Sequence, residues 1–383
     1  MALRIGIIIV LAGIVFFVGI PFALRLAGVD VFSSGEPSAG SALLRSDNGG
    51  ETWNNAALSE EPGVPFSGDI RALVVHPANP GVFIAGTNGS GLWRSENQGL
   101  SWRRMVDRTG GLAVNAVVYA IAVHPIESRI LYLAAFQQNR GRVLKSENGG
   151  ETFREVYATT ADRAFVFDIA VDAGDPDRVM AVTGQGGIIE SRNGGISWRP
   201  QRWFGEGLQR LWVNPQDPGE RYVMTVSANL WKTVDGGVNW ADIPESASRG
   251  VVQGIRYPPP NAFNFFGFGG SSGPGSRLAF AVDPRNPSVL YLGGGEGVLR
   301  STDAGQTWTA LDLLIPPNSL PIQAVAVNPF DSNMIFAIAN GELHMTRDGG
   351  ANWRATRIPV SGAVRSLFIH PLKPDIMFMA VGR

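Results

Sequence analysis

The chain of 383 residues contains no cysteine. Disulfides, thiolate metal sites, a cysteine nucleophile and a cysteine-linked lipid anchor are therefore excluded. Histidine is also scarce, and three of the histidines stand before or near a proline in expected turns. The four are not spaced as a metal cluster: His76, His124, His344 and His370. We predict neither a metal nor another cofactor.

An excess of charge of either sign is lacking as well. The 32 basic and 33 acidic side chains give a formal net charge of −1. A nucleic-acid partner would call for a basic excess, so none is predicted. Hydrophobic residues make up 44% and charged residues 17%, a mixture typical of globular proteins. Glycine (48) and proline (25) are abundant, which indicates many tight turns.

Residues 5–24 form one long uncharged run, IGIIIVLAGIVFFVGIPFAL. As a helix this run would span roughly 30 Å, the thickness of a bilayer core. A cleaved signal peptide has an apolar region of only about 7–15 residues, followed by a small-residue cleavage site. We therefore predict that residues 1–28 are an uncleaved membrane anchor, with a signal peptide as the alternative.

The charges around this run give its expected orientation. Arg4 precedes the run, while Arg25 follows it and is offset by Asp30. Because positive flanks favour the cytoplasmic side, the N-terminus is expected inside and the rest of the chain outside. Residues 29–41 include a stretch rich in Ser, Gly and Pro, typical of a flexible linker. We predict a single-pass cell-membrane protein with its main domain periplasmic or extracellular.

After the linker, a pattern of eight residues, here called the octet, recurs seven times. The copies are SDNGGETW (46–53), SENQGLSW (95–102), SENGGETF (146–153), SRNGGISW (191–198), TVDGGVNW (233–240), STDAGQTW (301–308) and TRDGGANW (346–353). The third residue, Asn or Asp, can accept hydrogen bonds from nearby backbone N–H groups and hold a tight turn. The fifth is always glycine, as expected where φ must be positive.

The last octet residue is a large aromatic, suited to packing under the turn. The residues predicted to build these turns are Asn48, Trp53, Asn97, Trp102, Asn148, Phe153, Asn193, Trp198, Asp235, Trp240, Asp303, Trp308, Asp348 and Trp353.

A second pattern, here called the Pro-turn hairpin, precedes each later octet. Two copies are RALVVHPANPGVFIAG (71–86) and LAFAVDPRNPSVLYLG (278–293). Each predicts two strands joined by a turn that begins with His, Asn or Asp, usually before a proline. The strands are nearly continuous in apolar residues, as in sheets buried on both faces. Hairpin and octet together predict a four-stranded antiparallel blade of about 45 residues.

The two ends of this repeating region are complementary halves. It opens with a lone octet hairpin (42–54) and finishes with a lone Pro-turn hairpin (364–381). Joining them gives one complete blade, which closes a ring with the six internal blades. We therefore predict an all-β fold in which residues 42–383 form a seven-bladed β-propeller.

The octets resemble Asp boxes, also called BNR repeats, and the resemblance covers residues 42–383. Such boxes occur in sialidases, two-propeller xyloglucanases, sortilin-type receptors and the photosystem II assembly-factor family. The chain is most similar overall to the assembly-factor group, which has one exported propeller that binds a membrane protein. The resemblance implies that the boxes are structural turns on the rim away from the ligand face. It also implies a protein-binding or assembly scaffold with a protein partner, and a membrane-embedded protein is among the candidates.

Enzymatic activity is the alternative that the resemblance raises. A sialidase needs three arginines, a tyrosine nucleophile with a supporting glutamate, and an acid/base aspartate. Five residues before the Pro-turn, the inner strands carry Arg71, Tyr119 and Arg365 on neighbouring blades. These residues mark either a small anion or glycan site at the channel mouth, or merely solvated side chains. At the next register, Asp168 and Arg210 are expected to pair internally.

A xyloglucanase needs a cleft between two propellers, and a single propeller cannot build such a cleft. We therefore predict a non-enzymatic protein, with a glycan-binding or sialidase-like glycoside hydrolase propeller as the alternative.

Two segments are rich in the side chains that binding surfaces favour. The insertion 241–277 contains a cluster of aromatic residues, and residues 199–208 (RPQRWFGEGL) are expected to form a neighbouring loop. Exposed apolar patches mark interfaces, and Arg and Trp are frequent hot spots. The insertion could instead bury its own aromatics as a flap. The predicted partner-binding residues are Arg199, Arg202, Trp203, Phe204, Arg256, Tyr257, Phe263, Phe265, Phe266 and Phe268.

Overall fold

The computed structural model describes residues 42–66, 68–243, 279–295, 297–313, 315, 320–359 and 362–382. The predicted anchor (1–28) and linker (29–41) lie outside these ranges, as does the insertion from 244 to 278. Within the described ranges, no helix has the length and apolar character needed to cross a bilayer.

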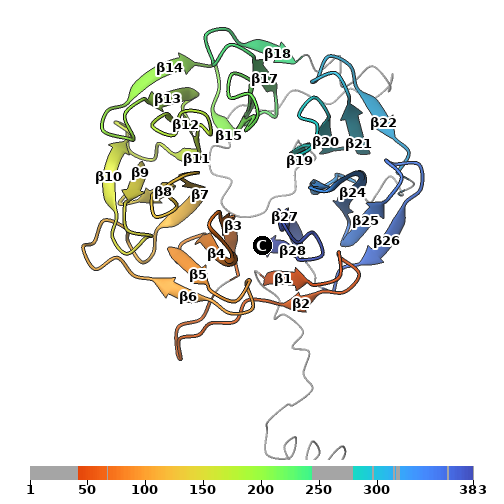
Figure 1. The fold of residues 1–383 in the computed structure, drawn as a ribbon, viewed down its shortest axis with the longest axis horizontal. Coiled ribbons are helices and arrows are strands. Elements are labelled where there is room, and N and C mark those ends of the chain that lie inside the picture. The colour runs from red at the N-terminus through yellow and green to blue at the C-terminus, as the bar shows by residue number, and fades with distance from the viewer. Residues whose placement is uncertain are drawn as a thin grey trace, which may run out of the picture. The chain divides into compact units, whose positions relative to one another are not determined.

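The described residues form seven four-stranded antiparallel sheets arranged around a ring (Figure 1). Six of these blades are continuous in sequence. The first three contain β3 (Ile70–His76), β4 (Asn79–Thr87), β5 (Leu92–Ser95) and β6 (Arg103–Met105); β7 (Val117–Val123), β8 (Leu131–Gln137), β9 (Arg140–Ser146) and β10 (Arg154–Ala158); and β11 (Val166–Val171), β12 (Val179–Thr183), β13 (Gly187–Ser191) and β14 (Arg199–Trp203).

The next three blades contain β15 (Leu208–Val213), β16 (Arg221–Thr225), β17 (Leu230–Thr233) and β18 (Ala241–Ile243); β19 (Ala279–Val282), β20 (Leu290–Gly294), β21 (Gly297–Ser301) and β22 (Thr309–Leu311); and β23 (Ala324–Asn328), β24 (Asp331–Ala339), β25 (Glu342–Thr346) and β26 (Arg354–Arg357). In each blade the first strand lies innermost and the fourth outermost (Figure 1). The predicted order of strand, Pro-turn, strand, strand, octet, strand is therefore confirmed.

The seventh blade joins the two ends of the repeating region. It consists of β1 (Ala42–Ser46), β2 (Asn54–Asn55), β27 (Ala363–Ile369) and β28 (Met377–Gly382), in the spatial order β2-β1-β28-β27. β1 pairs antiparallel with β28, with Leu44 opposite Met379. The prediction that two half-blades close the ring is confirmed.

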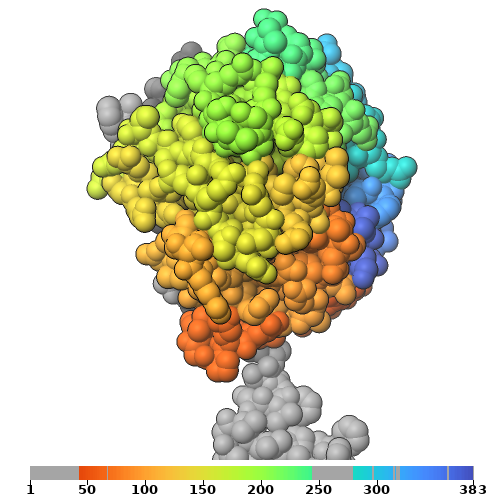
Figure 2. All heavy atoms as spheres, turned by 60° about the vertical axis from the view of Figure 1, so that its left-hand side comes forward, coloured from red at the N-terminus to blue at the C-terminus, as the bar shows by residue number. Residues whose placement is uncertain are grey.

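The core lies between neighbouring blades. The second strands are the most buried, and every residue of β12, β16 and β20 is buried. Their side chains meet those of the next sheet; Tyr222 and Met224 of β16, for example, pack in one cluster with Leu290 and Leu292 of β20. Figure 2 shows the closely packed outer side of the blades from β7 to β14. Burial on both faces explains why these strands read as continuous apolar runs.

Candidate functional site

The seven octets form one repeated hydrogen-bonded turn. In the first, Ser46 Oγ donates to Asn48 Oδ1 (2.9 Å) and accepts from the Gly50 N–H (2.8 Å), while Asn48 Oδ1 accepts from the Thr52 N–H (2.9 Å). The same bonds recur around the third residues of the other octets, Asn97, Asn148, Asn193, Asp235, Asp303 and Asp348. Through these bonds the third octet residue holds its turn in every blade.

Hydrogen bonding to the three aspartates favours their charged form. Bonds from within each octet lower the pKa of Asp235, of Asp303 and of Asp348 to about 2. At neutral pH these carboxylates are therefore ionised and are engaged by their own turns.

Each octet is tied to the Pro-turn of its own blade. The N–H of the fourth octet residue donates to a Pro-turn carbonyl, as from Gly49 to Asp375 O (3.0 Å), and all seven blades share this bond. The fourth residue also has a positive φ, even where it is Gln98 (61°) or Ala304 (57°). Octets and Pro-turns therefore share one end of the strands, here called the octet rim.

The fifth octet residue packs against the preceding blade. A Cβ on Gly50 would lie 2.6 Å from Leu343 Cδ2, and one on Gly99 would lie 2.7 Å from Phe378 Cε1. A side chain at either position would force its neighbour to shift, so these two glycines serve close approach as well as a positive φ. The octet is therefore the joint between successive blades.

The aromatic octet residues pack beneath their turns. Trp53, Trp240, Trp308 and Trp353 each donate Nε1–H to the carbonyl of the fifth glycine at 3.0–3.1 Å. Trp102 differs, since it donates to Ala56 O at 2.9 Å. Phe153 is buried, and Trp198 is partly buried beside the core between β7–β10 and β11–β14.

One joint between blades is polar. Where blade β15–β18 meets blade β11–β14, Gly237 contacts Gln201 instead of an apolar side chain. The Gly236 carbonyl accepts from Arg178 Nη2 (3.0 Å), Gln201 Nε2 (2.9 Å) and Arg221 Nη1 (2.8 Å). Arg221 is fully buried, and burial lowers its pKa to about 10, so it stays charged at neutral pH.

Two buried carboxylates balance this positive charge. Arg178 Nε bonds Glu190 Oε1, and Arg221 Nη2 lies 3.6 Å from Asp172 Oδ2. The sequence analysis did not identify this network, because its bonds join residues as far apart in sequence as Arg178 and Gly236, which are 58 positions apart.

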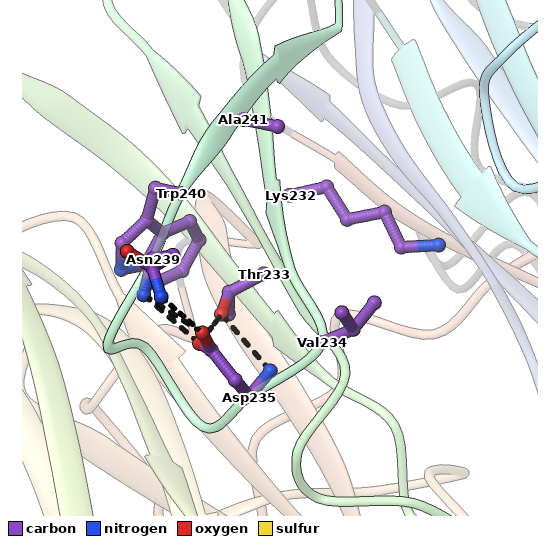
Figure 3. A pocket seen from close by; sticks show the side chains of 7 residues that line it. All are labelled: Lys232, Thr233, Val234, Asp235, Asn239, Trp240 and Ala241. Atoms are coloured by element: carbon purple, nitrogen blue, oxygen red, sulfur yellow. Dashed lines mark hydrogen bonds between the residues drawn. The ribbon is translucent and has the colours of Figure 1, made fainter.

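A shallow pocket lies at the octet of blade β15–β18 (Figure 3). Its lining residues are Lys232, Thr233, Val234, Asp235, Asn239, Trp240 and Ala241. Asp235 is turned toward Thr233 and Asn239 and is bonded to both (Figure 3). Lys232 Nζ pairs with Glu220 Oε1 at 2.7 Å. The charged groups of this pocket already have partners within their own blade.

Two histidines also act within turns at the octet rim. His124 Nδ1 accepts the Glu127 N–H (2.9 Å), and His370 Nδ1 accepts the Leu372 N–H (3.0 Å). His370 Nε2 lies 3.0 Å from Pro80 O on the next blade. These are the turn positions that the Pro-turn pattern predicted.

The opposite end of the inner strands, here called the mouth, carries a series of β-bulges. In five consecutive blades the ladder skips one residue at the equivalent position. The skipped residues are Arg365, Arg71, Tyr119, Phe167 and Gln209. A bulge leaves its extra residue unpaired in the ladder and redirects the side chain. Arg71, Tyr119 and Arg365, which the sequence analysis selected, therefore occupy structurally equivalent bulge positions.

The bulges of the composite blade and blade β3–β6 gather charged side chains. Arg365 Nη1 lies 3.5 Å from Asp69 Oδ1, and both side chains are 15% exposed. Asn88 Nδ2 donates to Asp69 Oδ2 at 3.0 Å. Arg71 acts on Tyr119, whose pKa burial raises to about 12 against the opposing positive charge of Arg71. Tyr119 is therefore protonated at neutral pH.

Aromatic side chains extend this group of residues at the mouth. Tyr119 packs edge-on to Phe167, with ring centroids 5.1 Å apart. Phe167 stacks on Phe165 at 5.3 Å, and Phe165 stacks on Phe136 at 4.6 Å. Sequence reasoning selected Tyr119 but missed Phe136 and Phe165, which join it from the second strand and from the residue before β11.

Asp168 makes a bond between blades. Its carboxylate accepts the Leu211 N–H of the next blade (3.0 Å) and the Ile169 N–H (2.9 Å). Burial raises its pKa, and the charge of Arg210 opposes the shift. The hydrogen bond between the two blades is thus made by the backbone N–H of Leu211, while the positive charge of Arg210 acts to lower the pKa of Asp168.

The prediction of a loop over 199–208 was wrong for its first half, because Arg199–Trp203 form β14. Arg199 pairs with Glu190 at 3.4 Å, and Arg202 lies over the rings of Phe204 (5.0 Å) and Trp231 (5.8 Å). The aromatic and cationic character that suggested a binding loop therefore serves largely to pack blade against blade.

Trp203 differs from Arg202 and Phe204, since it is 58% exposed. It lies opposite Gly187 at the mouth end of its blade, with its ring over the glycine backbone. The other predicted binding residues lie outside the described ranges: Arg256, Tyr257, Phe263, Phe265, Phe266 and Phe268.

No protein-family model matches the sequence. Among curated proteins, the chain is 24% identical over 319 residues to a probable oligoxyloglucan-reducing end-specific xyloglucanase of Neosartorya fischeri, covering 79% of this chain and 32% of that protein. It is 27% identical over 160 residues to the photosystem II assembly lipoprotein Ycf48 of a Synechococcus species, covering 40% and 39%. The chain spans about a third of the length of the xyloglucanase.

The similar solved structures include the same two kinds of protein, xyloglucanases and Ycf48. A GH74 xyloglucanase from Xanthomonas campestris matches with a TM-score of 0.58 at 18% identity, over 82% of this chain and 50% of that one. Ycf48 bound to a D1 peptide matches with a TM-score of 0.58 at 14% identity, over 82% and 94%. These similarities establish the seven-bladed propeller fold.

Proposed function

We propose that this chain is a non-enzymatic binding scaffold of the Asp-box type, which holds a protein segment at its mouth. The observation that carries the proposal is the arc of five bulged residues, from Arg365 to Gln209, on five consecutive blades. Bulges redirect side chains from rigid strands, which suits them to binding sites. At the other end of the same strands, the polar groups of the octets are used within the turns.

The similarity to Ycf48 supports a protein partner. The solved Ycf48 structure contains a bound D1 peptide, and the present chain covers 94% of that chain. The mouth offers Arg71 and Arg365 beside the rings of Tyr119 and Phe167, and Arg and Tyr are frequent hot-spot residues. Together with the anchor at 1–28 and linker at 29–41, this favours a membrane-embedded partner on the extracytoplasmic side.

Further contacts belong to the same proposal. Trp203 supplies exposed aromatic surface at the mouth end of β14. The aromatic residues of the insertion 241–277 remain predicted contacts, since that segment joins β18 to β19 at the mouth ends of both strands.

A glycan-binding or glycoside hydrolase propeller is the second candidate, supported by the similarity to xyloglucanases. Glycosidic hydrolysis ordinarily uses two carboxyl groups that flank the scissile bond. At the mouth, Asp69 is engaged by Asn88 and Arg365, and Asp168 accepts two backbone N–H groups. The commitment of these two carboxylates to structural contacts favours binding over catalysis.

The test compares proteins that co-purify with the full-length chain from cross-linked membranes. The mouth variant carries Arg71→Ala and Arg365→Ala, and the matched control carries Arg347→Ala and Arg354→Ala at the octet rim, where both arginines are exposed. We expect the mouth variant to lose the captured partner and the rim variant to retain it. Equal capture by both variants would place the partner elsewhere.

A parallel screen addresses the second candidate. The purified chain is incubated with xyloglucan oligosaccharides and fluorogenic glycosides, and is also applied to a glycan array. The scaffold proposal predicts no turnover of any of these glycans. If the wild type releases product and the Asp168→Asn variant does not, the hydrolase proposal replaces the scaffold proposal.

A further inference from the structure

Three octets contain an Asn-Gly pair, at Asn48, Asn148 and Asn193. In such a pair the glycine backbone nitrogen can attack the asparagine Cγ. The Cγ–Nδ2 bond then breaks, ammonia leaves, and water opens the cyclic imide to aspartate or isoaspartate. Glycine offers the least steric hindrance to this attack because it has no side chain. In an unfolded chain, these three asparagines are therefore sites of spontaneous deamidation.

The folded octet restrains the group that would be attacked. Asn148 Oδ1 accepts from Ser146 Oγ (2.9 Å) and from the Thr152 N–H (3.0 Å), while its Nδ2 donates to Thr152 Oγ1 (2.9 Å). The same three bonds hold Asn48 and Asn193. The carboxamide must leave these partners before it can cyclise.

The attacking nitrogen is restrained as well. Its N–H donates to a Pro-turn carbonyl, from Gly49 to Asp375 O (3.0 Å), from Gly149 to Arg129 O (2.8 Å) and from Gly194 to Asp177 O (2.9 Å). Because three hydrogen bonds hold the carboxamide and another holds the attacking N–H, cyclisation requires local opening of the turn.

The aspartate product is already present in other blades of the same molecule. At Asp303, the bonds from Ser301 Oγ (2.8 Å) and the Thr307 N–H (2.8 Å) are kept, and Thr307 Oγ1 donates to Oδ2 (2.6 Å). The hydroxyl reverses its role, from accepting an amide proton to donating its own. An aspartate in this turn therefore loses none of the bonds that the asparagine makes.

We propose that Asn48, Asn148 and Asn193 are shielded deamidation sites in a turn that tolerates the aspartate product. Folding slows cyclisation at all three, and conversion to aspartate adds a negative charge at the octet rim without opening the blade. Isoaspartate differs, because it inserts an extra carbon into the backbone between the third and fourth octet residues and disrupts the bond to the Pro-turn.

The test measures deamidation by peptide mass mapping of the full-length chain at alkaline pH, folded in detergent and unfolded in guanidinium chloride. We expect the three sites to react at least about tenfold more slowly in the folded chain, because several hydrogen bonds must break first. Asn97, which occupies the same turn but precedes Gln98, is the internal reference and stays slow in both states. Equal folded and unfolded rates would overturn the shielding.

A site-specific variant separates shielding by the turn from a general effect of folding. Thr152→Val removes the hydroxyl that holds Asn148 and leaves the Asn193 turn intact. We expect a faster rate at Asn148 alone; unchanged rates would contradict the proposed restraint. In the tolerance arm, the variant Asn48→Asp, Asn148→Asp, Asn193→Asp is expected to unfold at the wild-type temperature, and a clear loss would refute tolerance.

Discussion

The octet rim and the mouth are opposite ends of the same strands, yet their polar groups are used differently. At the rim, the hydroxyl, amide and carboxylate groups of every octet repeat one set of bonds that holds the turn and joins it to its own blade. At the mouth, the equivalent bulge positions carry two arginines, a tyrosine, a phenylalanine and a glutamine. The repeat is therefore strict where blades join and varied where a ligand could be met.

The largest expected effect comes from the joint glycine Gly99. Changing Gly99→Val places a side chain at a φ of 82° and against buried Phe378. We expect a loss of about 3–5 kcal/mol in unfolding free energy, from left-handed strain and overpacking together. Denaturant unfolding of the wild type and the variant measures this loss in unfolding free energy.

Gly110→Val is the matched control for this change. Gly110 has a similar φ of 79°, but a Cβ there meets no atom within 4 Å. Its expected cost is only the strain of about 1–2 kcal/mol. Equal costs at both sites would mean that packing against the preceding blade contributes nothing.

The next effect comes from the polar joint. Glu190→Gln removes the buried negative charge that pairs with Arg178, and leaves that guanidinium with only the more distant Asp172 carboxylate at 3.9 Å. We expect a loss of about 3 kcal/mol, as for other broken buried pairs. Glu96→Gln is the control: that carboxylate is 53% exposed beside Arg94, and its loss is expected to cost under about 1 kcal/mol.

Acid should lower the stability of the fold by protonating the aspartates of the octet rim. Asp235, Asp303 and Asp348 each have a folded pKa of about 2, below the ordinary 3.8. A lowered carboxyl pKa adds stability above the unfolded pKa, and this stability is lost as pH falls toward the folded pKa. Unfolding free energy should therefore decline between about pH 4 and pH 2.

The triple variant Asp235→Asn, Asp303→Asn, Asp348→Asn tests the source of that decline. Its stability should depend less steeply on pH in the same window, because asparagine does not titrate. Parallel pH profiles for the wild type and the variant would assign the acid sensitivity to other carboxylates, such as Glu190, whose pKa is also lowered by Arg178.

The smallest expected effect on stability is at the mouth. Arg71→Ala alters a partly buried bulge position outside the blade joints, so we expect a change within about 1 kcal/mol. Partner capture should fall even though the melting temperature hardly moves. A large loss of stability would show that Arg71 belongs to the structural framework, as the octets do.

The architecture could be predicted because its causes are local and repeated. The glycine of each octet and the proline of most hairpins specify turns, and the apolar runs between them specify buried strands. Ring closure followed from two complementary half-blades, later seen as β1 pairing with β28.

What could not be predicted depends on contacts between distant residues. The fourth octet residue has a left-handed backbone, but the sequence does not reveal this, because Gln98 and Ala304 adopt that conformation without being glycine. The bulges depend on ladder register, which no single strand reveals. Arg202 and Phe204 suggested a binding loop, but they pack against Trp231 of the next blade, an arrangement that only tertiary structure shows.

The composite blade has a consequence for biosynthesis. Among the described strands β1 is made first and β28 last, so the nascent chain carries a β1 edge without its β28 partner until β28 has been synthesised. Ring closure must therefore wait for the synthesis of β28, and a chain terminated before that strand would expose the β1 edge to pairing with other molecules. Chaperone demand should be greatest for chains cut short just before Met377.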